Sequence, residues 1–278
     1  MIFSLWKGYG AKGSLPVFDS FEQGASRHGH TCVYHDESAD AHVIWSVLER
    51  GKMSLNSRLW NLGKPVIVLE TSTVPLSNTW RVGLNGLTKD HIVMFPDQIK
   101  RENFLFPKMS EWKYNQQGFI LICTQNTKSK LWHGMPEPRE WVRELITNIR
   151  KFTDRKIVVR SHPRSPFPVY EHNYENVTRQ VPANKQDFSD SLLDAIDNAW
   201  CVINHNSSPS VISVINGVPV FCDKTSLSSA VSNYDLRCVE SLKYPDRSQW
   251  FEWLMRTEWT LQEISSGLIF EKFYDIMM

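Results

Sequence analysis

The sequence predicts an α/β protein with two Rossmann-like domains that face a cleft, followed by C-terminal helices. Two observations support this prediction. Short β-branched and apolar runs alternate with segments of helical periodicity, which is typical of parallel sheets. Two such alternating series are separated by residues 96–117, which follow neither pattern. The chain has 278 residues, enough for two domains of ordinary size. The expected domains are residues 1–112 and 113–245, with C-terminal helices at 246–278.

The first domain opens with a strand at residues 1–5 and a glycine-rich loop containing Gly8, Tyr9 and Gly10. Glycines let a backbone approach a ligand closely, so these three residues are candidates for donor binding. The loop lacks the G-x-G-x-x-G spacing of dinucleotide sites, and a plain strand-to-helix connection is the alternative. Further strands are expected at residues 31–34, within 40–47 and at 65–70, and helices at 16–27 and 50–62.

An acidic residue closes the strand at residues 65–70. Glu70 stands at its carboxyl end, where a carboxylate can act as a general base, and Asp19 and Asp36 are the other candidates. The alternative for Glu70 is a cap or a salt bridge. Residues 71–85 are polar, aromatic and cationic at once, and we interpret them as a binding loop that includes Arg81.

Residues 96–117 interleave basic and aromatic side chains. Lys100, Arg101 and Lys113 alternate here with phenylalanine, tryptophan and tyrosine. Together with Arg81, these cations are candidates for contacts with the backbone of a nucleic-acid acceptor. A charged connecting segment with a few buried aromatic residues is the alternative.

The second domain repeats the alternation. Strands are expected at residues 118–124, 156–160, 201–203 and 218–222, and helices at 138–152, 188–198 and 209–215, with residues 173–186 irregular. The strand at 156–160 runs directly into His162 and Arg164. Arginine suits phosphate because its fork donates parallel hydrogen bonds, so Arg160, His162 and Arg164 are candidates for ligand contact.

A polar loop follows the strand at residues 201–203 and leads into a helix with Pro209 in its first turn. A helix N-terminus favours an anion, and ligands of open α/β sheets bind at the carboxyl edge of the strands. Ordinary N-caps are the alternative. The candidate donor-binding residues in this loop are Asn204, His205, Asn206, Ser207, Ser208 and Ser210.

The last 33 residues are expected to form helices at 248–255 and 261–264, and Trp250, Trp253 and Trp259 are expected to pack as core.

Composition limits the function classes. The 31 basic and 30 acidic residues give a net charge of +1, so a global basic excess for nucleic acid is absent, although a local basic groove remains compatible. The five cysteines are scattered without metal-ligand spacing, which suggests reduced thiols in a cytoplasmic protein and no metal site. Neither a signal peptide nor a membrane-spanning run is recognised in the sequence.

Three segments resemble GT-B glycosyltransferases of the capsule type: Arg160-Ser161-His162-Pro163, the loop at residues 204–208, and Asn216-Gly217-Val218-Pro219-Val220. The resemblance implies that the second domain binds a nucleotide sugar such as a UDP-sugar, with its phosphates at the loops around Asn206 and His162. It implies no other cofactor. The E-x(7)-E signature of many retaining members is not evident.

The segment 78–86, the loop at 160–164 and the segments 245–247 and 259–261 are also similar to phage DNA glycosyltransferases. This resemblance implies transfer of a sugar to a hydroxyl on a modified pyrimidine, such as hydroxymethylcytosine, in duplex DNA within the host cytoplasm. The acceptor base would have to flip out of the duplex to reach the cleft.

Two alternatives remain open. A glycosyltransferase acting on a cell-surface glycan would share the donor site and differ only in its acceptor. A non-catalytic nucleotide-sugar-binding protein would bind the diphosphate without turnover. A third reading, an NAD-dependent enzyme, is disfavoured by the missing glycine fingerprint.

Overall fold

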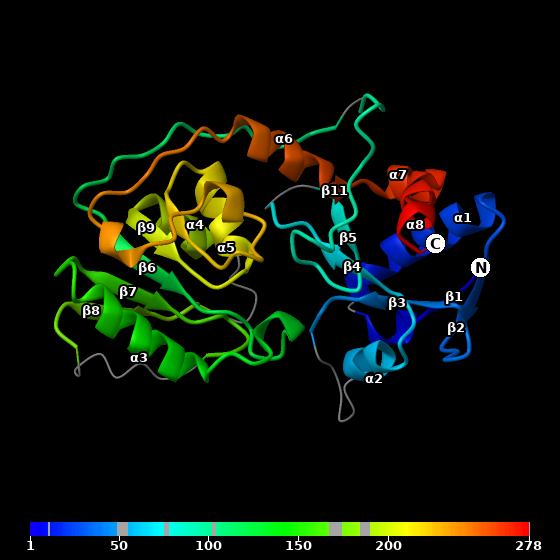
Figure 1. Ribbon diagram of the computed structural model, residues 1–278, viewed down its shortest axis with the longest axis horizontal. Coiled ribbons are helices and arrows are strands. Elements are labelled where there is room, and N and C mark those ends of the chain that lie inside the picture. The colour runs from blue at the N-terminus through cyan, green and yellow to red at the C-terminus, as the bar shows by residue number, and fades with distance from the viewer. Residues whose placement is uncertain are drawn as a thin grey trace. The chain divides into compact units, whose positions relative to one another are not determined.

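A computed structural model describes residues 1–10, 12–48, 55–74, 78–101, 104–166, 174–183 and 190–277. The chain forms two compact units, Met1–Phe106 with Glu252–Met278, and Pro107–Phe251. Each unit is an α/β structure with its own sheet (Figure 1). The predicted fold class, two Rossmann-like α/β domains, is confirmed at this level. No helix within the described ranges is both long enough and apolar enough to cross a bilayer.

The first unit contains a six-stranded sheet with the order β11-β5-β4-β3-β1-β2. Its strands are β1 (Ile2–Leu5), β2 (Thr31–Tyr34), β3 (Ala41–Trp45), β4 (Val66–Thr71), β5 (Trp80–Leu84) and β11 (Glu258–Trp259). Strands β1 to β4 are parallel, whereas β5 and β11 pair antiparallel. The four predicted strands therefore form the parallel part of the sheet.

Strand β5 corrects the prediction that residues 71–85 form a binding loop. Val82 is fully buried and Leu84 nearly so, and Arg81 pairs with Glu70 across the antiparallel ladder. In the sequence, Val82 and Leu84 are surrounded by polar and cationic residues, so the local pattern does not predict strand β5. Pairing with β4, which requires the folded sheet, makes the segment a strand.

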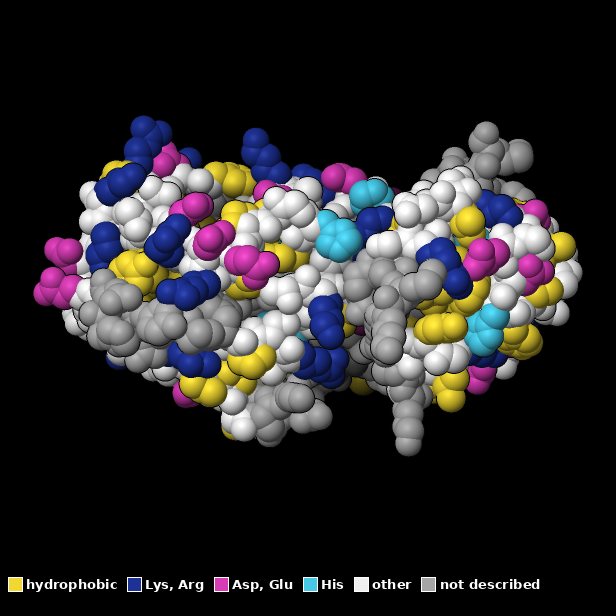
Figure 2. Space-filling model, turned by 90° about the horizontal axis from the view of Figure 1, so that it is seen from below, with side chains coloured by type: hydrophobic (Ala, Val, Ile, Leu, Met, Phe, Trp, Pro, Cys, Tyr) yellow, Lys and Arg dark blue, Asp and Glu magenta, His cyan; other side chains and the backbone are white. Residues whose placement is uncertain are grey.

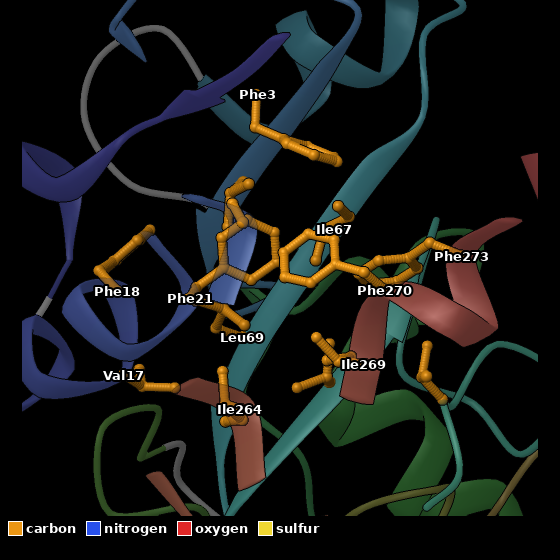
Figure 3. Packing of buried hydrophobic residues seen from close by; sticks show 14 of the residues in the cluster. Phe3, Val17, Phe18, Phe21, Ile67, Leu69, Ile264, Ile269, Phe270 and Phe273 are labelled. Atoms are coloured by element: carbon orange, nitrogen blue, oxygen red, sulfur yellow. The ribbon is translucent and has the colours of Figure 1, made fainter. Parts of the chain in front are cut away.

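The helices of the first unit are α1 (Leu15–Arg27), α2 (Leu55–Asn61), α7 (Leu261–Ser266) and α8 (Leu268–Met277), with short 3-10 helices at Lys7–Tyr9 and Lys12–Ser14. The start of the helix expected at residues 50–62 lies outside the described residues. An aromatic core joins the chain's two ends (Figure 3). The ring of Phe21 lies 5.5 Å from Phe3 of β1 and 5.0 Å from Phe270 of α8.

The C-terminal segment from Glu252 onward therefore belongs to the first unit, and residues 246–278 do not form a separate part. Trp259, expected to pack as core, is fully buried in edge strand β11 and donates its Nε1–H to the carbonyl of Val93 at 2.8 Å. The boundary between the units falls at residues 106/107 instead of 112/113.

The second unit contains a five-stranded, fully parallel sheet with the order β10-β9-β6-β7-β8. Its strands are β6 (Phe119–Cys123), β7 (Ile157–Arg160), β8 (Val177–Gln180), β9 (Ala199–Ile203) and β10 (Val220–Phe221). Its helices are α3 (Pro138–Ile149), α4 (Asp190–Asp197), α5 (Ser208–Ile215) and α6 (Ser248–Arg256, which continues into the first unit), with 3-10 helices at Lys130–Trp132, Ser229–Val231 and Leu236–Cys238. Strand β8 lies in the segment expected to be irregular.

This order has one topological switch point. From β6 the chain winds outward through β7 and β8, and then returns to the other side of β6 through β9 and β10. The loops after β6 and β9 therefore leave the sheet in opposite directions, and ligands of open α/β sheets bind in the crevice between such loops. The topology therefore predicts a ligand site at the carboxyl edge of β6 and β9 in this unit.

Candidate functional site

Four polar loops follow the strands at the carboxyl edge of the second sheet: residues 124–129 after β6, 161–166 after β7, 204–207 after β9 and 222–226 after β10. We call this region the switch-point site. The strand order alone brings the loops to one edge, although they are far apart in sequence.

Hydrogen bonds join three of these loops around Asn206. Its backbone N–H donates to Gln125 Oε1 at 3.4 Å, and its Nδ2 donates to Thr225 Oγ1 at 3.1 Å. Thr225 Oγ1 in turn donates to Asp223 Oδ1 at 2.6 Å. The backbone N–H of Asp223 donates to the carbonyl of His205 at 2.8 Å. The loops after β6, β9 and β10 therefore form one hydrogen-bonded assembly.

The loop after β7 is joined to the loop after β6. The N–H of His162 donates to Thr124 Oγ1 at 3.1 Å, and Ser165 Oγ donates to Asn126 Oδ1 at 3.0 Å. The N–H of Arg164 donates to His162 Nδ1 at 3.1 Å, so that nitrogen carries no proton. Burial, together with the charge of Arg164, lowers the pKa of His162 to about 4. At neutral pH His162 is therefore a neutral imidazole whose Nε2–H is a donor.

His205 is held against the loop after β6. Its ring meets Trp132 edge-on, with the centroids 5.6 Å apart. Burial lowers the pKa of His205, although the Asp223 carboxylate opposes this effect. Burial would raise the pKa of Asp223, but the hydrogen bonds from Thr225 outweigh it and the pKa is lowered. The site therefore holds a neutral ring beside a carboxylate.

Helix α5 begins at this edge. Ser207 is its N-cap, but the Ser207 side chain makes no capping hydrogen bond. Pro209 has no N–H, and the N–H of Ser210 bonds to the carbonyl of Ser207 at 3.2 Å. Of the first three helical residues, Ser208 is therefore the one whose amide is available to a ligand.

Two residues predicted to contact the donor, Ser210 and Arg160, are buried within the unit. Ser210 is fully buried, and its hydroxyl lies 3.2 Å from Ser226 Oγ and 3.1 Å from Ser228 Oγ. Arg160 is 4% exposed, and its Cα pairs with Cys123 in the sheet. Ser210 packs against the loop after β10, and Arg160 is the last residue of β7; Asn204, in the loop after β9, is buried to the same extent.

The remaining donor candidates, Gly8, Tyr9 and Gly10, lie in the first unit. A Cβ at Gly8 would come within 3.3 Å of the His35 ring, and a Cβ at Gly10 within 2.1 Å of Ser14 Oγ. Tyr9 is 47% exposed, and its ring centroid is 5.7 Å from that of His35. Close packing within the unit accounts for both glycines.

The three candidate bases differ in how strongly they are engaged. Asp19 accepts from Lys7 Nζ at 2.9 Å. Asp36 accepts from the Ser38 hydroxyl and N–H, which lower its pKa. Glu70 lies half-buried at the end of β4 and accepts from its neighbour Thr71 at 2.9 and 3.1 Å. Asp19 is therefore held by a residue 12 positions away, whereas Asp36 and Glu70 are each engaged by a near neighbour in the chain.

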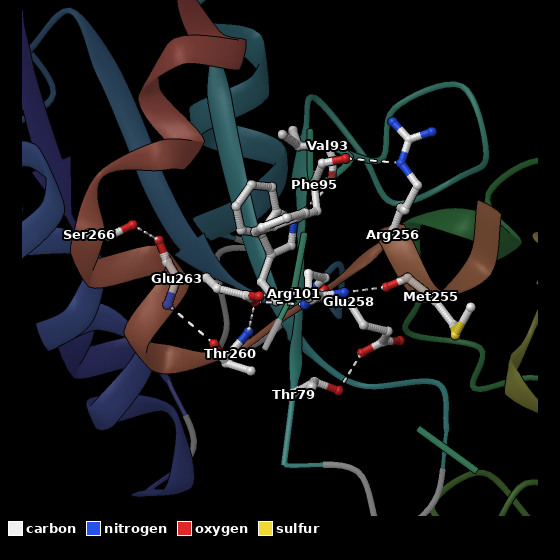
Figure 4. A network of polar contacts seen from close by, with 11 residues as sticks. Thr79, Val93, Phe95, Arg101, Met255, Arg256, Glu258, Thr260, Glu263 and Ser266 are labelled. Atoms are coloured by element: carbon white, nitrogen blue, oxygen red, sulfur yellow. Dashed lines mark hydrogen bonds and ion pairs between the residues drawn. The ribbon is translucent and has the colours of Figure 1, made fainter. Parts of the chain in front are cut away.

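Arg101 has a structural role that the sequence did not predict (Figure 4). Its guanidinium donates to both carboxylate oxygens of Glu263, at 2.7 and 2.6 Å, and to the carbonyls of Met255 and Glu258. It also lies 3.3 Å from the ring centroid of Phe104. These contacts use four of its five N–H donors inside the first unit.

The other cations proposed for the acceptor are placed differently. Lys113, in the second unit, forms an ion pair with Asp197 at 2.8 Å. Arg81 donates its Nε–H to the carbonyl of Thr71 at 3.0 Å, and Lys100 is exposed. On the face seen in Figure 2, basic and acidic side chains are interspersed.

Sequence reasoning missed Gln125, Asn126, Asp223 and Thr225 as members of the site. Each follows an apolar strand that was predicted, so their position after a strand end was the available signal. The part of the chain that the structure describes contains no group of three His, Cys, Asp or Glu side chains arranged to hold a metal ion.

The sheets and the switch-point site place the chain among proteins built from two Rossmann-like units. No protein-family model and no curated protein sequence matches the chain. The solved β-Kdo 2,4 transferase KpsC of Thermosulfurimonas dismutans is similar in structure, with a TM-score of 0.51 and 11% identity over 96% of this chain and 90% of that one.

Two further solved structures are similar at lower scores. The β-Kdo 2,7 transferase of the same organism has a TM-score of 0.43 and 14% identity, over 96% of this chain and 90% of that chain. A UDP-GlcNAc 2-epimerase of Methanocaldococcus jannaschii, solved with UDP-GlcNAc and UDP, has a TM-score of 0.37 and 11% identity, over 100% and 99%. At these identities the similarity concerns the fold alone. Of the three structures, the 2,4 transferase is the one whose TM-score supports a comparison of folds.

Proposed function

We propose that this protein is a glycosyltransferase that binds a nucleotide-diphosphate sugar at the switch-point site. The observation that carries the proposal is the joining of the loops after β6, β9 and β10 through Asn206, at the edge where open α/β sheets bind ligands. The sequence resemblance to GT-B enzymes and the fold similarity to a transferase support the same class.

The charges around the site suit a diphosphate. Arg164, Lys128 and Lys224 are exposed cations on three different loops of this edge. The amide of Ser208 and the Nε2–H of His162 add neutral donors. In transfer, the bond from the anomeric carbon to the diphosphate breaks and the diphosphate leaves with the electron pair. Fixed donors and cations stabilise that growing charge.

The acceptor hydroxyl must lose its proton as its oxygen attacks the anomeric carbon. Glu70 is the base that we propose, because it stands near the carboxyl end of β4, at the edge where open α/β sheets bind ligands.

The acceptor that the sequence predicts is a hydroxyl on a modified pyrimidine of DNA, and a glycan hydroxyl is the alternative. Arg101 and Lys113, two of the four cations assigned to DNA, are engaged in ion pairs. The donor chemistry is the same for both acceptors, so the choice between them is experimental.

The test offers UDP-, ADP-, GDP-, dTDP- and CMP-linked sugars together with duplex DNA containing 5-hydroxymethylcytosine or with oligosaccharides, and detects products by mass spectrometry. Transfer to DNA that weakens steeply as salt rises supports the DNA acceptor. Transfer to oligosaccharide alone rejects it. Binding without any transfer would leave a nucleotide-sugar-binding protein, and neither binding nor transfer would reject the proposal.

Arg164→Ala tests the location of the donor. We expect the nucleotide sugar to bind about tenfold more weakly, because one charge-assisted contact to phosphate is lost. The matched control is Lys151→Ala, an exposed cation just past the carboxyl end of α3 and outside the four loops. Equal affinity of both variants would move the donor site elsewhere.

A further inference from the structure

The loop after β9 carries a hydrogen-bond acceptor that the protein leaves unused. Asn204 is 3% exposed, and its Nδ2 donates to the carbonyl of Ser207 at 3.0 Å and to Ser207 Oγ at 2.9 Å. A carbonyl oxygen can only accept, so the amide nitrogen must face Ser207. Asn204 Oδ1 therefore faces away from Ser207. This oxygen is buried and accepts no hydrogen bond from the described residues.

Asn206 presents a second such acceptor. Its Nδ2 lies 3.1 Å from Thr225 Oγ1, which could in principle donate or accept. The hydroxyl of Thr225 has one proton and gives it to the Asp223 carboxylate at 2.6 Å, so Thr225 must accept from Asn206. The orientation of this amide is thus also determined, and Asn206 Oδ1 is buried without a partner in the described part of the chain.

These two oxygens restrict what can bind beside them. A buried acceptor without a donor costs about 1–3 kcal/mol, so a group that supplies the proton is favoured there. The oxygens of an ionised diphosphate are acceptors as well, and they would be repelled. A hydroxyl group donates, and a nucleotide sugar carries hydroxyls on both its ribose and its transferred sugar.

We infer that Asn204 and Asn206 are specificity residues that accept hydrogen bonds from sugar hydroxyls of the ligand. The inference rests on the proposed function. It divides the loop predicted to hold the diphosphate: the two carboxamides hold hydroxyls, and the Ser208 amide with the cations of the neighbouring loops holds the phosphates.

The experiment compares ligands that differ by one hydroxyl, by isothermal titration calorimetry. The probes are UDP, 2′-deoxy-UDP, 3′-deoxy-UDP, UDP-glucose and UDP-2-deoxyglucose, or the same series on whichever nucleotide binds most tightly in the donor panel. They are measured against the native chain, Asn204→Ala and Asn206→Ala. Asn216→Ala is the matched control, because Asn216 bonds to Ile212 at the opposite end of the same helix.

For the native chain and Asn216→Ala, we expect loss of the recognised hydroxyl to weaken binding about tenfold. In at least one of the two site variants the same deletion should change affinity less than twofold, because its acceptor is gone. A deoxyribose effect assigns the oxygens to the ribose, and a deoxysugar effect assigns them to the transferred sugar. Thermal melting verifies folding, and Asn206→Ala carries the test if Asn204→Ala does not fold.

The inference would be overturned if deleting the recognised hydroxyl weakened binding to both site variants as much as to the native chain. It would also be overturned if no hydroxyl deletion changed the affinity of the native chain. Since nucleotide binding would persist, the proposed function would stand. If the native chain bound no nucleotide at all, both would be rejected.

Discussion

Replacing Arg101 by methionine tests whether this residue holds the first unit together or binds an acceptor. Methionine keeps the length of the side chain and its packing on Phe104 but removes every donor. The Arg101 side chain is 10% exposed and that of Glu263 16%, and two parallel hydrogen bonds of 2.7 and 2.6 Å join them. The carbonyls of Met255 and Glu258 lose donors at 2.7 and 2.6 Å.

Removing one partner of a buried ion pair costs about 3–5 kcal/mol. The cost here should lie near the lower end, at about 3 kcal/mol, because Glu263 keeps the N–H of Thr260 at 2.7 Å and is not left wholly unpaired. Lys100→Met removes a neighbouring exposed cation and should change stability by less than about 0.5 kcal/mol.

Urea denaturation followed by circular dichroism measures both variants against the native chain. We expect the transition of the first unit to move to a lower urea concentration for Arg101→Met alone. An Arg101→Met protein as stable as the native chain, with weakened DNA binding, would refute the structural role and restore the acceptor role that the sequence suggested.

Three further outcomes are expected. Glu70→Gln should lower kcat for sugar transfer by about 10²–10⁴-fold, with Asp19→Asn as a near-neutral control, and an unchanged kcat would remove Glu70 as the base. Because burial holds the pKa of His162 at about 4, below its ordinary 6.5, the unfolded chain takes up a proton between these values that the folded chain does not. Stability should therefore fall as pH is lowered through this window, and His162→Asn should flatten the fall in the denaturation midpoint; an unchanged slope would contradict the assignment. Gly217 has φ +78°, and a Cβ there would lie 1.9 Å from the carbonyl oxygen of Glu111, so Gly217→Ala should cost more than about 2 kcal/mol in urea denaturation. Gly134→Ala, at φ +77° with open space around it, should cost about 1 kcal/mol, and equal costs would count against the close approach.

The parts of the fold that could be predicted are those determined by neighbours in the chain. Strand β3 (Ala41–Trp45) lies within the predicted range 40–47 and is buried at every position, and helix α1 (Leu15–Arg27) begins one residue earlier than expected. A parallel strand covered on both faces is apolar throughout, and an amphipathic helix has its own period, so both leave a local pattern. Strand β5 and the two-residue strand β11 have no such local pattern, because they become strands only by antiparallel pairing at one side of the sheet.

The sequence by itself determined the α/β class and the location of polar loops at the carboxyl ends of the strands. Tertiary structure decided which atoms of those loops are used. Asn206 meets Gln125 and Thr225 across separations of 81 and 19 residues, and the contact with Thr225 determines which way its side-chain amide faces. Arg101 looks like a surface cation in the sequence, yet it meets Glu263 across 162 residues. Burial and hydrogen-bond partners arise only when distant segments pack together, so a local pattern can name the residue types but not their roles.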